Sequence, residues 1–190
     1  MYCLESFCTD PVENLNFEEK LCSLNTEIFM LWRNSPSIIV GRYGNIENDV
    51  DVDFANSNNI KIVRRNSGGG TVYHDLGNVN YSFIMKDDKN LTLEYFSRII
   101  IKTLDKIGIN ANLEFSHNDI KADGLKISGS AQYHSHGVIL HHGTLLFDSD
   151  LKIMQKILKN CGHVANIRPM LKNDMNINEF MKGIFENVEF

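Results

Sequence analysis

The chain has 190 residues, of which 43% are hydrophobic and 23% are charged, a size and composition typical of one globular domain and not of a disordered chain or a coiled coil. Its formal net charge of −5 disfavours nucleic acid and anionic membranes as partners, because both are bound through a basic face. No apolar run approaches the about 20 residues of a membrane helix, and the first residues do not resemble a signal peptide. The four cysteines, Cys3, Cys8, Cys22 and Cys161, form no CxxC pair, so we expect a reducing cytoplasm and neither zinc nor disulfides.

Helical and extended patterns alternate along the chain without a repeat or a dividing linker, so we expect one domain over residues 1–190. Up to residue 84 the expected elements are a helix over 14–24, strands over 27–32 and 37–40, a short helix over 49–58, and strands over 60–64 and 78–84. The clearest helix follows over 91–107, where Phe96, Ile100 and Leu104 fall on one apolar stripe. Beyond it we expect two strands around Asp123-Gly124, a strand over 138–147, and helices over 151–158 and 177–186. Helices thus flank the strands at both ends, which predicts a mixed sheet covered by helices.

A first candidate site lies where the strand over 60–64 runs into the sequence RRNSGGGTVYHD, residues 64–75. Glycines have no Cβ and allow backbone N–H groups to surround an anion, and Arg65 beside them could hold a phosphate or a carboxylate through two hydrogen bonds. The segment is not a P-loop, because no GK[ST] follows, and it lacks the GxGxxG spacing of a dinucleotide site. The alternative is a hairpin loop with solvated arginines.

A second candidate site is the sequence DIKADGLKIS, residues 119–128, whose central Asp-Gly predicts a hairpin with a two-residue turn. The register that follows from this turn is Ala122–Leu125, Lys121–Lys126, Ile120–Ile127 and Asp119–Ser128. The apolar members, Ile120, Ala122, Leu125 and Ile127, would then face the core. The two opposed lysines repel each other by roughly 0.2–1 kcal/mol, a cost that an anion lying over them would remove. The alternative is that both lysines extend into water.

A third candidate site is the pair His141 and His142 on the apolar strand. Adjacent residues on a strand point to opposite faces, so the two rings cannot bind one metal ion together. We expect His141 to be structural. For His142, which shares a face with Thr144, a structural and a functional role both stay open.

Together these motifs resemble the lipoate–protein ligase A family, within the biotin/lipoate ligase fold. The resemblance rests on RRNSGGGTVYHDLGN at 64–78, GLKISGSAQ at 124–132 and HHGTLL at 141–146, with weaker support at 10–19 and 40–42. It implies an α+β, class II synthetase-like catalytic domain with a mixed, mainly antiparallel β-sheet covered by helices. Typical members carry a smaller accessory domain after this one. Because the chain stops near the end of the catalytic domain, we expect that accessory C-terminal domain to be absent.

The resemblance also implies a reaction. Family members bind lipoic acid in an apolar tunnel, activate it with ATP as lipoyl-AMP, and pass the lipoyl group to a lysine of an acceptor protein. The acceptors are the glycine-cleavage H protein and the E2 subunits of 2-oxoacid dehydrogenases. Mg²⁺ is the expected cofactor of the adenylation step, with Asp119 as its candidate ligand. Some members keep the accessory domain as a separate polypeptide, so a separate accessory subunit is a further expected partner.

The family's site residues can be carried over position by position. The positions expected to bind ATP and lipoyl-AMP are Arg65, Ser67, Gly68, Gly69, Gly70, Thr71, Val72, Tyr73, Lys126 and Ser130. Lys126 falls on the lysine that contacts both lipoate and the nucleotide phosphate, and it is the candidate catalytic residue. The candidates for the lipoate pocket are His74, His142 and Gly143.

Two other functions stay open. The sequence Asn160-Cys161-Gly162 resembles the cysteine segment of related acyltransferases, so the chain could move octanoyl or lipoyl groups through a Cys161 thioester, with Lys126 as the second member of the dyad. A lone cysteine after a helix is more typical of a buried or unreactive residue, however. The third function is a lipoate-binding module without catalytic activity.

Overall fold

The structure, a computed structural model, describes residues 1–24, 26–114 and 119–190. Its helices are α1 (Pro11–Cys22), α2 (Ile46–Asp49), α3 (Val52–Ser57), α4 (Leu93–Ile107), α5 (Leu151–Ile157) and α6 (Ile177–Asn187), with a 3-10 turn, η1, at Arg168–Met170. Its strands are β1 (Tyr2–Glu5), β2 (Ile28–Trp32), β3 (Ser37–Val40), β4 (Lys61–Arg64), β5 (Val72–His74), β6 (Asn78–Lys86), β7 (Ala111–Glu114), β8 (Asp119–Ala122), β9 (Leu125–Ser128), β10 (Ser130–Ser135) and β11 (Val138–Leu146).

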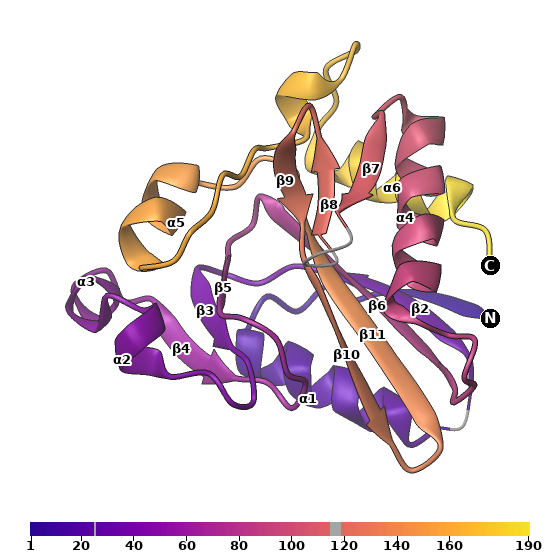
Figure 1. Ribbon diagram of the computed structural model, residues 1–190, viewed down its shortest axis with the longest axis horizontal. Helices are drawn as coiled ribbons and strands as arrows, with labels where there is room; N and C mark the ends of the chain where they lie inside the picture. Colours follow the sequence, from indigo (N-terminus) through magenta and orange to yellow (C-terminus); the bar gives the residue numbers. More distant parts are fainter. Residues whose placement is uncertain (25, 115–118) are drawn as a thin grey trace.

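These strands form three sheets (Figure 1). The largest has the strand order β1-β2-β6-β11-β10, and β4-β3-β5 and β7-β8-β9 form two smaller sheets. Among the described strands, β1 pairs with β2 and β3 with β4 in parallel, whereas the other pairs are antiparallel. The predicted α+β fold with a mixed, mainly antiparallel sheet is therefore confirmed.

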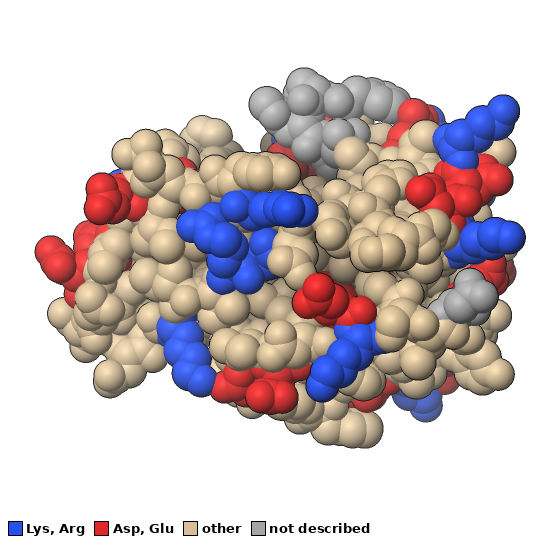
Figure 2. Space-filling view, turned by 90° about the horizontal axis from the view of Figure 1, so that it is seen from below, with Lys and Arg blue, Asp and Glu red and all other residues tan. Residues whose placement is uncertain are grey.

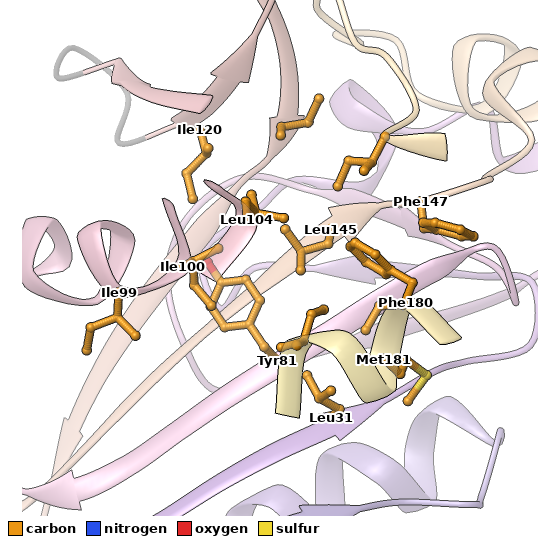
Figure 3. Packing of buried hydrophobic residues seen from close by; sticks show 14 of the residues in the cluster. Leu31, Tyr81, Ile99, Ile100, Leu104, Ile120, Leu145, Phe147, Phe180 and Met181 are labelled. Carbon is orange, nitrogen blue, oxygen red and sulfur yellow. The ribbon is translucent and has the colours of Figure 1, made fainter. Parts of the chain in front are cut away.

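The large sheet is covered by helices on both faces. This explains why the sequence of β2 contains no polar residue. Ile28, Met30 and Trp32 point to an apolar cluster beneath α1. Phe29 and Leu31 alternate with them and point to the larger cluster that α4 and α6 close (Figure 3). Because successive side chains of a strand face opposite sides, a strand covered on both faces must be apolar throughout.

The structure confirms the helix predicted over 91–107 as α4. The side chain of Thr92 caps its first turn, and Gly108, with φ of 96°, ends it in the left-handed conformation that glycine adopts without strain. Phe96, Ile100 and Leu104 of the predicted stripe are buried against the large sheet.

The short helix predicted over 49–58 is wrong in its bounds, because two helices, α2 and α3, occupy this region. Val50 separates them in extended conformation, and the next N–H, that of Asp51, donates to the carbonyl of Ile157 at the end of α5. This tertiary pairing interrupts the helical turn. The strands β1, β5, β7 and β10 were not predicted.

The hairpin register is correct next to the turn and wrong beyond it. Lys121 pairs with Lys126 as predicted, but Ile120 pairs with Ser128, because a bulge shifts β9 by one residue. Ile127 remains fully buried, whereas Leu125, also predicted to face the core, is 37% exposed at the turn. A second partner fixes β9 from its other edge, where residues 163–165 exchange hydrogen bonds with Lys126.

The surface carries both signs of charge. The face in Figure 2 shows acidic and basic side chains scattered among uncharged residues, several of them side by side, with one compact basic group and no basic surface that covers the face. In the described part of the chain, no helix combines the length and the apolar character that a bilayer crossing requires.

Candidate active site

A cavity of about 410 Å³ lies where the three sheets meet, and residues of α1, α2 and the segment after α5 complete its wall. This volume falls within the range of about 300–1,000 Å³ that is usual for small-molecule sites. The lining residues are Leu15, Trp32, Ile39, Asp49, Arg65, Gly69, Gly70, Thr71, Val72, His74, Asn80, Asp119, Lys126, Gly129, Ser130, Ala131, His142, Gly143, Thr144, Leu158 and Asn160. The cavity thus unites the three segments that the sequence singles out.

Four of the candidate residues do not line the cavity: Ser67, Gly68, Tyr73 and Cys161. The Ser67 hydroxyl and the Gly68 carbonyl both accept hydrogen bonds from the Arg65 guanidinium. Tyr73 packs into the core of the small sheet, where burial raises the pKa of its hydroxyl. Cys161 packs partly buried against the same cluster, and burial raises the pKa of its thiol, a rise that nearby Lys126 opposes.

Arg65 has a different set of contacts from the anion grip that the sequence suggested. Its NH2 group donates to the carbonyls of Gly68 and Gly70 at 2.7 Å each, NH1 donates to the carbonyl of Ile39, and Nε donates to the hydroxyl of Ser67. Arg65 therefore holds the triglycine loop, residues 68–70, from inside.

The Arg65 guanidinium is buried, and its positive charge acts on the loop that it contacts. Only 8% of Arg65 is exposed, and burial lowers its pKa to about 10, a shift that the charge of Glu18 opposes. A buried guanidinium beneath the loop makes the loop more favourable for an anion, even without direct contact.

The backbone N–H groups of the loop lack partners within the described part of the chain. The carbonyls of Gly68 and Gly70 accept from Arg65, whereas the N–H groups of Gly68, Gly69 and Gly70 donate to no acceptor among the described residues. Gly69 has φ of 86°, so the backbone changes direction within the loop. Successive N–H groups in a turn of this kind form a nest for an anion.

Lys126 lines the same cavity from strand β9. Its ammonium contacts the carboxylate of Asp119 at 2.8 Å, and the lysine side chain is 36% exposed. Gly129 allows this position, because a Cβ at Gly129 would approach the Lys126 Nζ to 3.1 Å. Lys121, which stands opposite Lys126 in the hairpin, is instead paired with Glu114 at 3.2 Å. Each lysine thus has its own carboxylate, and the repulsion that the sequence suggested is relieved within the protein.

Two carboxylates line the cavity and bear on the expected magnesium ion. Asp119 is paired with Lys126, and Asp49 accepts a hydrogen bond from the Thr71 hydroxyl at 2.6 Å. In residues 1–24, 26–114 and 119–190, no group of three or more His, Cys, Asp or Glu side chains forms a metal site. Mg²⁺ is usually held by one or two carboxylates together with substrate phosphates. The residues therefore fit a magnesium ion that arrives with a nucleotide.

The two adjacent histidines face opposite sides of the sheet, as predicted. His141 is buried and stacks on Phe96, with ring centroids 4.6 Å apart, which confirms its structural role. His142 lines the cavity, with Nδ1 3.0 Å from both carboxylate oxygens of Glu18 and Nε2 2.7 Å from the Ser67 hydroxyl. The sequence left the role of His142 open, and the structure places it at the site.

His74 is the second histidine of the cavity. Its Nδ1 lies 3.1 Å from the amide nitrogen of Asn34. Burial, assisted by the charge of Arg65, lowers the pKa of His74 to about 3, so the ring is neutral. The ring packs edge-on to Trp32, which also lines the cavity. His74, Trp32, Leu15 and Ile39 make this part of the wall largely apolar.

The sequence did not single out Glu18 as a site residue, although a signal was present. Leu15, Glu18 and Cys22 share one face of α1, and an acidic residue on a helix face that packs against a core needs a partner. That partner, His142, is 124 residues away in the chain. Trp32, Asn80 and Asp49 were also missed, because they lie outside the three motifs.

A family comparison matches residues 10–189 to the lipoyl protein ligase A/B catalytic domain. Lipoate–protein ligase LplJ of Bacillus subtilis is 38% identical to this chain over 94% of the chain and 59% of its own length. Lipoate–protein ligase 1 of Staphylococcus aureus is 38% identical over 95% of the chain and 60% of its own length. The chain therefore spans about six tenths of the length of these curated relatives.

Solved structures give the same result. A lipoate–protein ligase A bound with ATP superposes with a TM-score of 0.87 at 26% identity and covers 98% of this chain and 84% of its own. Protein Ta0514 of T. acidophilum with bound lipoic acid superposes with a TM-score of 0.86 at 27% identity and covers 98% and 82%. Biotin protein ligase of Aquifex aeolicus, at 11% identity and a TM-score of 0.56, shares the fold alone. The chain belongs to the lipoyl protein ligase A/B catalytic domain family, which confirms the resemblance seen in its motifs.

Proposed function

We propose that this chain carries the catalytic site of a lipoate–protein ligase. In the first step a lipoate carboxylate oxygen attacks the α-phosphorus of ATP, the bond to the β-phosphate oxygen breaks, and lipoyl-AMP and pyrophosphate form. In the second step the amine of an acceptor lysine attacks the lipoyl carbonyl, AMP leaves, and the amine loses a proton. The observation that carries the proposal is one cavity lined both by Lys126 and by Gly69 and Gly70 of the triglycine loop.

The chemistry explains why these groups are needed. A carboxylate and a triphosphate are both anions, and negative charge accumulates on the phosphoryl oxygens in the transition state. The Lys126 ammonium and the free N–H groups of Gly69 and Gly70 would be donors fixed in advance around that charge. Asp119 keeps the ammonium in place until a substrate anion takes its position.

The acyl chain would contact the apolar part of the cavity wall. Leu15, Trp32 and Ile39 line this part, and the neutral ring of His74 adds no charge to it. Such a wall suits the hydrocarbon chain of lipoate and excludes water from the reacting carboxylate. The structures of Ta0514 with lipoic acid and of a ligase A with ATP are consistent with both ligands binding to this fold.

Mg²⁺ would be held by the phosphates of ATP with Asp119, and Asp49 is the second carboxylate within the same cavity. When bound, the ion supplies positive charge to the phosphate oxygens.

The acceptor and any accessory subunit belong to the proposal as well. A T. acidophilum structure is described as a bi-partite lipoate protein ligase and its E2 lipoyl domain, and it superposes on this chain with a TM-score of 0.85 at 26% identity. By this analogy the proposed partner is a lipoyl-acceptor protein, an H protein or an E2 subunit, and a separate accessory subunit is a further proposed partner.

The test is incubation of the chain with ATP, Mg²⁺, lipoate and H protein, with the intermediate and the product followed by mass spectrometry. A parallel reaction receives preformed lipoyl-AMP in place of ATP and lipoate. We expect the H protein to gain one lipoyl group at least in the second reaction. Binding of lipoate without modification of any acceptor in either reaction would contradict the proposal and favour a non-catalytic binding module.

A third reaction tests the acyltransferase alternative with an octanoyl carrier protein. The structure does not favour it, because Cys161 does not line the cavity and burial raises the pKa of its thiol. We therefore expect no octanoyl mass shift on the chain. A shift that is lost in Cys161→Ser would establish the thioester route instead.

A further inference from the structure

We propose that Glu18 is a positioning residue, which fixes the ring proton of His142 on Nδ1 and thereby holds Ser67 and Arg65 in the arrangement that shapes the triglycine loop. The kinetic part of this inference rests on the proposed function, whereas the position of the proton does not. The inference starts from the directions of the hydrogen bonds in a buried chain of side chains.

The first direction is set at Glu18. A carboxylate only accepts hydrogen bonds, so the His142 Nδ1, which lies 3.0 Å from both carboxylate oxygens, must donate. Glu18 is 2% exposed, and a buried carboxylate is costly unless donors surround it. The Ser82 hydroxyl is a second donor to it, and Ser82 in turn accepts from the indole N–H of Trp32 at 2.9 Å.

The second direction is set at Ser67. Its hydroxyl oxygen accepts from the Arg65 Nε at 2.9 Å and lies 2.7 Å from the His142 Nε2. If the His142 Nε2 also carried a proton, the Ser67 oxygen would accept twice, and its own hydrogen would have no acceptor in the described part of the chain. Ser67 is 1% exposed, and such a buried orphan costs about 1–3 kcal/mol. The Ser67 hydroxyl therefore donates to an unprotonated His142 Nε2.

His74 supplies an internal comparison. The Asn14 amide nitrogen lies within 3.0 Å of the carbonyls of Cys8 and Arg33, and it also donates to the Oδ1 of Asn34 at 2.9 Å. This leaves the Asn34 nitrogen to donate to the His74 Nδ1, so the ring proton of His74 sits on Nε2. The hydrogen bonds thus place the ring proton on Nδ1 in His142 and on Nε2 in His74.

This series of hydrogen-bonded side chains leads to the triglycine loop, which the proposed reaction uses. Two arms converge on the Glu18 carboxylate: one runs from Trp32 through Ser82, and the other from Arg65 through Ser67 and His142. The guanidinium at the start of the second arm holds the carbonyls of residues 68 and 70. Loss of the acceptor at Glu18 would therefore release the geometry of the loop amides, although Glu18 itself does not line the cavity.

The order Ser67–His142–Glu18 is also that of a serine hydrolase triad. Two observations exclude attack by this serine: Ser67 does not line the cavity, and its hydroxyl oxygen already accepts from Arg65. The three hydrogen-bonded side chains therefore hold the site in place, and Ser67 does not form a covalent bond with a substrate.

The direct test is long-range ¹H–¹⁵N NMR of the full chain labelled at its histidines, with His142→Gln and His74→Gln used only to assign the resonances. We expect the protonated-nitrogen resonance of His142 at Nδ1 and that of His74 at Nε2. A proton on the Nε2 of His142 would overturn the inference, whatever the outcome of the activity assays.

The kinetic test compares Glu18→Gln with Glu19→Gln, because Glu19 is the exposed neighbour of Glu18 on α1. Glutamine is nearly isosteric, but it places an amide against the His142 nitrogen and removes the charge. We expect Glu18→Gln to raise the KM for ATP roughly 10- to 100-fold, the range known when a supporting hydrogen bond is removed. The KM for lipoate should change less, and Glu19→Gln should match the wild type.

Ser67→Ala interrupts the same series of hydrogen bonds between Arg65 and His142. The double variant Glu18→Gln/Ser67→Ala should be no worse than Ser67→Ala alone, because residues of one hydrogen-bonded chain are not additive. Additive losses, or a KM for ATP in Glu18→Gln equal to that in Glu19→Gln, would overturn the proposal. Should Glu18→Gln not fold, the NMR spectrum of the wild type and the KM of Ser67→Ala still decide it.

Discussion

The guanidinium of Arg65 contacts serine and backbone carbonyls, and its nearest compensating charge, that of Glu18, acts through two intervening side chains. The positive charge therefore remains uncompensated at short range and is directed at the loop above it. An incoming phosphate would both bind the loop amides and stabilise this buried cation. In the proposed function, Arg65 would thus contribute to binding by shaping the loop and its electric field.

The lowered pKa values of two buried histidines predict how the free energy of unfolding depends on pH. Burial holds the pKa of His141 well below its ordinary value and lowers that of His74 to about 3. Between these values and about 6.5 the unfolded state binds a proton that the folded state cannot, so stability is lost as pH falls below about 6.5. Each such histidine contributes a slope of about 1.4 kcal/mol per pH unit.

The variant His141→Phe isolates one of these protons, because phenylalanine can stack on Phe96 in the same place. Denaturant unfolding at pH 6 and pH 5 should show a pH dependence of the unfolding free energy that is smaller by about 1.4 kcal/mol per pH unit than in the wild type. An unchanged slope would mean that His141 takes up its proton in the folded chain.

At the scale of elements, the features that could be predicted from the sequence are those that depend on local patterns within one segment. The stripe and the cap of α4 lie within one segment, and the Asp-Gly turn fixes the first two pairs of its hairpin. The bulge in β9 could not be predicted, because it also depends on residues 163–165, which pair with its other edge. The strand β10 was missed because its residues are mostly half-buried and do not alternate.

Two glycines, Gly41 beside the triglycine loop and Gly70 within it, differ in what an added side chain would contact. A Cβ at Gly41 would collide with the backbone carbonyl of Gly69, whereas a Cβ at Gly70 meets no protein atom within 4 Å. Gly70 lines the cavity, so the space beside it is free for a ligand.

We therefore expect Gly70→Ala to keep the wild-type Tm and to raise the KM for ATP. Gly41→Ala should lower the Tm, because the loop backbone must move. Thermal unfolding and ATP titration of both variants test this distinction. A Gly70→Ala variant with normal ATP binding would show that the nucleotide does not approach this part of the loop.

At the scale of the molecule, the site exists only where the three sheets meet. Each motif was visible in the sequence as a single segment, and the resemblance to a family indicated that the motifs belong together. Their convergence on one cavity and the Glu18–His142 pair needed the tertiary structure, since these two residues are 124 positions apart. Lys126 is held by pairing on both edges of β9, so its ammonium approaches the cavity from a fixed strand.

The hairpin provides a matched pair of lysines for the central claim. Lys126 and Lys121 stand opposite each other, each with a carboxylate partner, but only Lys126 lines the cavity. Transfer from preformed lipoyl-AMP to H protein bypasses the adenylation step, so its rate tests this site without that step.

The decisive measurement is the single-turnover rate of that transfer in Lys126→Ala and Lys121→Ala. We predict that Lys126→Ala folds with the wild-type Tm and loses roughly 10²–10³-fold in rate, the cost of one fixed donor at a developing charge. Lys121→Ala should stay close to the wild type. Equal rates in the two variants would contradict the role of Lys126 and, with it, the proposed site.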